Sequence, residues 1–80
     1  MGGAARLVFL GRLADLAGVG EQAVLPGPLA DVLAGLAPAL AEALLAPRIR
    51  LALNGALVAP VGLVLAEGDE LAFLPPVSGG

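Results

Sequence analysis

The 80-residue sequence contains no cysteine and no histidine, and these absences remove most of the usual chemistry of a catalytic or metal site. Without cysteine there is no disulfide, no thiolate nucleophile and no thiolate-bound zinc or iron–sulfur site. Without histidine the chain lacks the commonest general base and metal ligand. Lysine, tyrosine, threonine and tryptophan are also absent, so Ser78 is the only hydroxyl nucleophile. A serine nucleophile needs a base and a group that orients it, and neither is adjacent to Ser78.

The carboxylates are the side chains that remain for acid–base chemistry. Three of the seven, Glu67, Asp69 and Glu70, fall within one predicted turn, where a paired acid and base is conceivable. Charged residues in a surface turn are more often simply solvated, and we favour that interpretation.

Charge and aromatic content bear on the class of partner. The net charge is −3 and only 2% of the residues are aromatic, whereas nucleic-acid-binding proteins use basic patches and aromatic stacking platforms. We therefore expect no nucleic-acid partner. An acidic surface suits a basic partner protein, although a small negative charge also serves solubility alone.

The sequence is 59% hydrophobic, but its apolar runs are short. The longest uncharged stretch, between Arg50 and Glu67, is shorter than the roughly 18 to 20 residues of a membrane-spanning helix. It also contains Asn54-Gly55 and Pro60, which favour turns. Near the N-terminus only residues 7–10 are apolar between two arginines, which is too few for the core of a secretory signal. We expect no membrane association and a cytoplasmic protein.

Hydrophobic periodicity predicts an alternation of short strands and helical segments. Asn54-Gly55 is a strong two-residue hairpin signal. Gly18 and Gly27 are placed to cap helices, and Pro28 suits a first helical position. Pro38 should interrupt the main helix. The predicted strands are 6–11, 22–25, 49–53, 57–59 and 70–74, and the predicted helical segments are 12–17, 28–36 and 38–47.

This element order is typical of an α+β protein in which one main helix packs on one face of a mixed sheet. The β-grasp is the arrangement that fits it best. The first and last strands would then pair in parallel at the centre of the sheet. We predict a folded domain over residues 1–74 and a projecting tail over residues 75–80.

The tail "PPVSGG" combines residue types that suit entry into a narrow site. Pro75 and Pro76 cannot continue a strand ladder and favour an extended, semi-rigid spacer. Gly79 and Gly80 have no side chains, so they would pass through a tight channel and present an unhindered terminal carboxylate. We therefore predict that the carboxylate of Gly80 is the reacting group.

The segment "GDELAFLPPVSGG" resembles the C-terminal signature of the small subunit of molybdopterin synthase, a ubiquitin-like sulfur carrier related to the carrier of the thiamine pathway. The resemblance extends over "RLVFLGRLADLAG", "LADVLAGL" and "LALNG", and the tail is its most specific part. Two departures, Pro28 at a position that is commonly a polar helix cap and an unusually apolar stretch at residues 61–65, leave the tail intact.

The resemblance implies a ubiquitin-like β-grasp fold and a defined use for Gly80. An E1-like adenylyltransferase would adenylate its carboxylate with ATP, and the adenylate would become a thiocarboxylate. The tail would then enter the large catalytic subunit of molybdopterin synthase and give its sulfur to cyclic pyranopterin monophosphate, in an assembly of two small and two large subunits. The chain itself would bind no cofactor and would act as a cosubstrate, with catalysis in its partners.

Two alternatives remain open from the sequence. One is a sulfur carrier for thiamine or for tRNA thiolation, and the other is a ubiquitin-like modifier or plain interaction domain. Strand alternation places Phe73 and Leu74 on opposite faces, so one apolar set is a candidate partner surface, with Phe73 as its anchor. The predicted partner-binding residues are Phe73, Leu74, Pro75, Pro76, Val77, Ser78 and Gly79.

Overall fold

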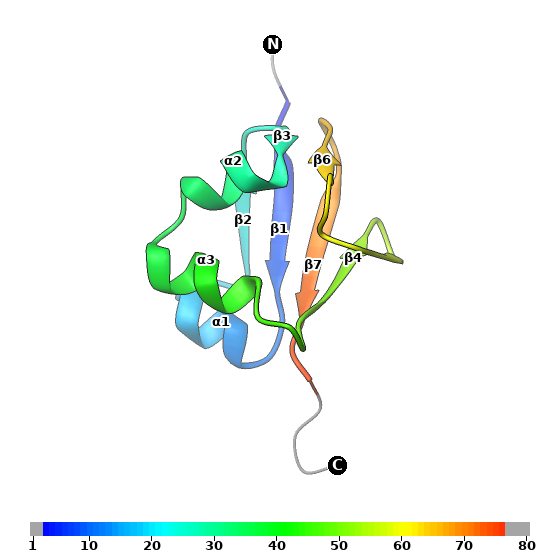
Figure 1. Cartoon of the computed structure of the whole chain (residues 1–80). Coiled ribbons are helices and arrows are strands. Elements are labelled where there is room, and N and C mark those ends of the chain that lie inside the picture. Colours follow the sequence, from blue (N-terminus) through cyan, green and yellow to red (C-terminus); the bar gives the residue numbers. More distant parts are fainter. Residues whose placement is uncertain (1–2, 77–80) are drawn as a thin grey trace.

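A computed structural model describes residues 3–76 of the chain. It shows a five-stranded mixed sheet in the order β2-β1-β7-β4-β5, a two-stranded sheet of β3 and β6, and three short helices (Figure 1). The α+β class is confirmed. The elements are β1 (Ala5–Phe9), α1 (Arg12–Ala17), β2 (Glu21–Val24), β3 (Gly27–Pro28), α2 (Leu29–Ala34), α3 (Pro38–Leu44), β4 (Arg50–Leu53), β5 (Ala56–Val58), β6 (Val64–Leu65) and β7 (Glu70–Leu74).

The predicted parallel pairing of the first and last strands is confirmed. β1 and β7 lie side by side in parallel, with Leu7 opposite Leu71 and Phe9 opposite Phe73. β4 flanks the other side of β7 in the antiparallel sense. The last strand is therefore the central strand of the main sheet, hydrogen-bonded on both sides.

One face of the sheet is covered by the helices and forms the core. Burial alternates along β7, where Leu71 and Phe73 are fully buried and Glu70, Ala72 and Leu74 are only partly buried. This period-two pattern is that of a strand with one covered face. The core residues are Ala5, Leu7, Phe9, Leu13, Leu29, Val32, Leu33, Leu40, Leu44, Leu51, Leu65, Leu71 and Phe73.

Phe73 requires a correction. Its side chain is 0% exposed and its ring stacks on that of Phe9 with a centroid separation of 6.1 Å. A side chain enclosed in this way is not accessible to a partner, so the expectation that Phe73 anchors an interface is wrong. The helices cover the face that carries Leu71 and Phe73, and the opposite face of β7 is the one left open.

The helical region follows the predicted interruption but not the predicted start. α2 ends at Ala34 and α3 begins at Pro38, so the main helix is divided before this proline as expected. Pro28 precedes α2 instead of opening it, with φ −58° and ψ 142°. Gly27 and Pro28 pair with Leu65 and Val64 to form β3 and β6. This small sheet was not predicted.

The Asn54-Gly55 hairpin is confirmed between β4 and β5. Both residues have positive φ, 51° and 89°, as a two-residue turn that matches the twist of a sheet requires. Gly18 ends α1 in the left-handed conformation, as predicted, and its N–H donates to the carbonyl of Ala14. Among residues 3–76 there is no helix with the length and apolar character needed to cross a membrane.

Candidate functional site

The candidate site begins where the chain leaves the central strand. β7 ends at Leu74, which lies opposite Arg50 of β4. The N–H of Leu10 donates to the carbonyl of Phe73 on the β1 side. Pro75 and Pro76 follow directly, and since proline has no backbone N–H the ladder cannot continue through them. The chain therefore leaves the middle of the sheet at a fixed point, with both prolines half-buried.

Gly11 contributes to this exit. Its backbone has φ 57° and ψ −135°, a conformation that is essentially restricted to glycine. A Cβ at this position would lie 3.2 Å from Cγ of Pro75. The turn between β1 and α1 thus lies close against the first proline. In the sequence, Gly11 marks only the end of a predicted strand, and its position next to a predicted helix start is the one local signal of this turn.

The predicted site residues fall into three groups. Leu74, Pro75 and Pro76 are brought together at the exit, each half-buried, whereas Phe73 lies in the core. Val77, Ser78, Gly79 and Gly80 lie outside the described residues, so their predicted roles stay predictions.

The acidic turn before β7, at residues 66–70, is stabilised by hydrogen bonds between its side chains and the backbone. Its carboxylates form no acid–base pair. Asp69 accepts hydrogen bonds from the backbone N–H of Ala66 at 2.8 Å and from the Nδ2 of Asn54 at 2.9 Å. These bonds lower the pKa of the Asp69 carboxyl, the backbone bond contributing most, because they favour its charged form. The N–H of Glu70 donates to Oδ1 of Asn54. The turn between β6 and β7 is therefore hydrogen-bonded to the Asn54 turn of the β4–β5 hairpin.

The carboxylate of Glu70 also has a structural partner. It accepts a hydrogen bond from Arg6 at 2.6 Å, and Glu21 lies 3.7 Å from the same guanidinium. The hydrogen bond to Glu70, followed by the charge of Glu21, raises the pKa of Arg6. All three side chains are substantially exposed, so these ion pairs contribute little to stability. Within residues 3–76 no three metal-ligating side chains cluster.

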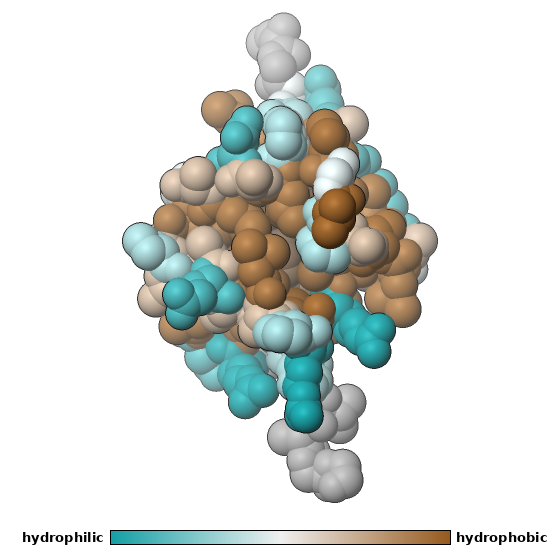
Figure 2. Space-filling view, viewed as in Figure 1, coloured by the Kyte–Doolittle hydropathy of each residue, from teal (hydrophilic) through white to brown (hydrophobic). Residues whose placement is uncertain are grey.

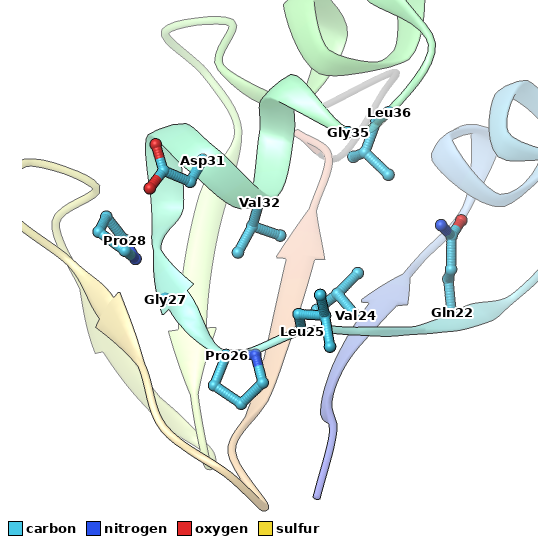
Figure 3. Close-up of a pocket in the computed structure, with 10 residues that line it drawn as sticks. All are labelled: Gln22, Val24, Leu25, Pro26, Gly27, Pro28, Asp31, Val32, Gly35 and Leu36. Atoms are coloured by element: carbon cyan, nitrogen blue, oxygen red, sulfur yellow. The ribbon is translucent and has the colours of Figure 1, made fainter. Parts of the chain in front are cut away.

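A groove of about 400 Å³ lies between β2 and α2 (Figure 3). Its walls are mainly apolar. Its two polar side chains, Gln22 and Asp31, lie at opposite ends of the view and do not converge. A small-molecule site usually places a few polar groups around one point, and this groove lacks that arrangement.

Comparisons with known proteins agree on one family. The model of the ThiS family matches residues 7–80. Solved structures of small archaeal modifier protein 1 (SAMP1) superpose over nearly the whole chain. The protein from Haloferax volcanii is 34% identical with a TM-score of 0.79, covering 98% of this chain and 100% of its own. That from Methanosarcina acetivorans is 28% identical with a TM-score of 0.76, covering 100% and 99%.

A third structure supports the fold alone. The putative molybdopterin converting factor, subunit 1, from Pyrococcus furiosus is 23% identical with a TM-score of 0.70, covering 94% of this chain and 99% of its own. Among curated proteins none matches the chain. The family match spans nearly all elements described above, including the exit of β7. The chain therefore belongs to the ThiS family and has its ubiquitin-like β-grasp fold.

Proposed function

We propose that this chain carries sulfur as a thiocarboxylate on Gly80 and delivers it in molybdenum cofactor biosynthesis. At the family level it is a ubiquitin-like carrier or modifier. The observation that carries the finer proposal is the exit of β7: the central strand ends at Leu74 and two prolines lead out of the sheet toward "VSGG". The family match extends through residue 80, so this segment is part of the family pattern.

The chemistry needs a partner enzyme because a carboxylate is a poor electrophile. In the proposed first step the Gly80 carboxylate attacks the α-phosphorus of ATP, pyrophosphate leaves, and an acyl-adenylate forms. Hydrosulfide supplied by a donor then attacks the carbonyl carbon, AMP leaves, and the sulfur remains on that carbon as a thiocarboxylate. With no cysteine or lysine in the chain, no side-chain thiol or amine of its own competes for the activated carbonyl.

The proposed partners are an E1-like adenylyltransferase, which uses ATP, and the large catalytic subunit of molybdopterin synthase. In the second partner the sulfur would pass to cyclic pyranopterin monophosphate and the Gly80 carboxylate would be restored. The resemblance of the tail to the small synthase subunit supports this destination, and the fold shared with the Pyrococcus furiosus protein is consistent with it. We place the carrier in the cytoplasm, in a complex of two small and two large subunits.

A second candidate function is protein modification. It is favoured by the SAMP1 structures, which are named as modifiers and are 34% and 28% identical to this chain. In that case a lysine amine of a target protein would displace AMP and form an isopeptide bond with Gly80. The chain has no lysine, so it cannot form ordinary lysine-linked chains of itself. Transfer of sulfur to thiamine precursors or to tRNA is a further destination for the same thiocarboxylate.

The test is a sulfur-loading assay with the activating enzyme, ATP and a sulfur donor. We expect intact-mass spectrometry to show the exchange of one oxygen for one sulfur at the C-terminus, and single-turnover assays to show transfer to the pterin substrate with the large subunit. Formation of lysine conjugates without a thiocarboxylate would favour the modifier function instead.

Deletion of Gly80 separates chemistry from docking. It leaves the reacting carbonyl one residue short, roughly 3.5 Å in an extended chain, and a misplacement of about 1 Å costs on the order of 100-fold in a positioned reaction. We expect loading to be abolished while circular dichroism stays unchanged. Gly79→Val should also impair transfer, and Ser78→Ala should have a mild effect. Near-normal loading without Gly80 would refute the carrier proposal.

A further inference from the structure

A groove lies beside the point where β7 ends. Its volume is about 610 Å³, and two arginines line it, whereas the groove between β2 and α2 has none. β4 and β5 supply one wall and the end of β7 supplies the other. The residues that line it, which we call the exit groove, are Pro47, Arg48, Arg50, Leu57, Leu74, Pro75 and Pro76.

The two arginines have no carboxylate partner among residues 3–76. Arg6, by contrast, lies within 4.0 Å of two carboxylates. Arg48 and Arg50 are both exposed, and they are two of only four cationic side chains in a protein of net charge −3. Two of the four cationic side chains therefore lie in one groove, and no carboxylate within residues 3–76 pairs with them.

The acidic turn is at the far end of the same strand. Glu70 begins β7 and Leu74 ends it, a separation of about 13 Å at the usual rise per residue. β7 therefore runs from an acidic end to a basic end. Figure 2 shows hydrophilic side chains at both ends of the molecule, including the lower end, where β7 ends in Figure 1. Such polarity orients an approaching charged partner.

The register of the sheet puts an apolar surface next to this charge. Arg50 lies directly opposite Leu74, and Leu57 lies opposite Ala52. Residues paired across strands project from the same face, as do residues two apart along a strand. Arg50, Ala52, Leu57 and Leu74 therefore share the open face, and the side chain of Leu57 is 69% exposed. This combination of two cations and aliphatic side chains fits a peptide better than a free phosphate.

We propose that the exit groove binds an acidic segment, with at least one aliphatic side chain, of the activating enzyme that receives Gly80. The carboxylates of that segment pair with Arg48 and Arg50, and its aliphatic side chain lies against Leu57 and Leu74. This inference rests on the proposed function, because it assigns the docking surface for the adenylation step. The contact holds the domain while the residues beyond Pro76 reach the adenylating site.

A peptide titration tests the groove without relying on adenylation. The probe is acetyl-Glu-Asp-Leu-Asp-Leu-amide added to the ¹⁵N-labelled full chain, and the control probe has Gln and Asn in place of the acids. We expect amide shift changes at Arg48, Arg50, Leu57 and Leu74 that are lost with the control probe and reduced by salt. Equal shifts with both probes, or shifts confined to other residues, would overturn the proposal. The same shifts on addition of inorganic phosphate in place of the peptide would show a phosphate site and would also overturn it.

An adenylation assay then tests the groove in its proposed use. The double variant Arg48→Gln/Arg50→Gln removes two charges at exposed positions, so the fold should persist. In ATP–pyrophosphate exchange with the activating enzyme we expect its KM to rise about tenfold while kcat stays near the wild-type value, because surface charges act mainly on association. Arg48→Lys/Arg50→Lys should restore most of the KM.

The matched control is Ala34→Glu/Ala39→Glu, which changes the net charge by the same two units at exposed positions of α2 and α3. It should leave KM unchanged. An equal rise in KM for both double variants would show a general charge effect and would overturn the proposed role of the exit groove. An unchanged KM for the arginine variant would overturn it as well. If the wild-type chain binds the peptide at the groove but supports no exchange with any activating enzyme, the proposed function fails and the docking partner with it, while the acidic-peptide site stands.

Discussion

Truncation of Phe73 tests whether this residue is core or interface. Its side chain is 0% exposed and stacks on Phe9 with an interplanar angle of 24°. Phe→Ala at a buried site costs about 3–5 kcal/mol of unfolding free energy, which includes roughly 0.5–1.5 kcal/mol for the aromatic pair. At about 0.05–0.15 kcal/mol per residue, an 80-residue domain has about 4–12 kcal/mol in total. Phe73→Ala should therefore remove a quarter or more of the stability.

The assay is urea unfolding followed by circular dichroism, which suits a chain without tryptophan or tyrosine. Phe73→Leu is the control, because it keeps an apolar side chain in the cavity and should cost less than half as much. Since the ring does not reach the surface, the folded Phe73→Leu protein should bind its partners normally. A loss below about 1 kcal/mol for Phe73→Ala, together with a specific binding defect in Phe73→Leu, would refute the core assignment.

Two further predictions concern the turns at the two ends of β7. In the folded protein the pKa of Asp69 is lowered by its hydrogen bonds to Ala66 and Asn54. The contribution of Asp69 to the free energy of unfolding is therefore complete above its unfolded pKa of about 4. It is lost as the pH falls through the lower pKa of the folded state. Unfolding monitored from pH 6 to pH 2 should give a steeper loss for the wild type than for Asp69→Asn, and parallel curves would contradict this origin. Gly11→Ala should lower the unfolding free energy by about 1–3 kcal/mol, because alanine is strained at the backbone conformation of Gly11 and its Cβ would crowd Pro75; an unchanged melting temperature would show that the turn rearranges freely.

The sequence was sufficient for features with strong local signals. The Asn54-Gly55 turn, the left-handed Gly18 and the break before Pro38 each follow from one or two residues whose backbone preferences are narrow. The parallel pairing of β1 with β7 followed from the order of the elements. These features fix the point where the chain leaves the sheet, and so the position of the candidate site.

Other features depended on tertiary contacts that no local pattern encodes. β3 and β6 have two residues each, too few for a period-two pattern, so only the pairing of Pro28 with Val64 reveals them. Both faces of β7 carry apolar residues, and the sequence alone did not show that the helices cover Phe73 rather than Leu74. The exit groove also went unrecognised, because Arg48 and Arg50 come together with Leu74 only through the register of β4 and β7.

The central position of β7 has a mechanical consequence. A partner that pulls on the residues beyond Pro76 pulls along the axis of a strand that is hydrogen-bonded to β1 on one side and to β4 on the other. Such a load is parallel to the strand, so it shears two ladders at once and their hydrogen bonds share the force, whereas an edge strand pulled in the same way would be held by one ladder alone. The domain should therefore resist unravelling when it is pulled by this end.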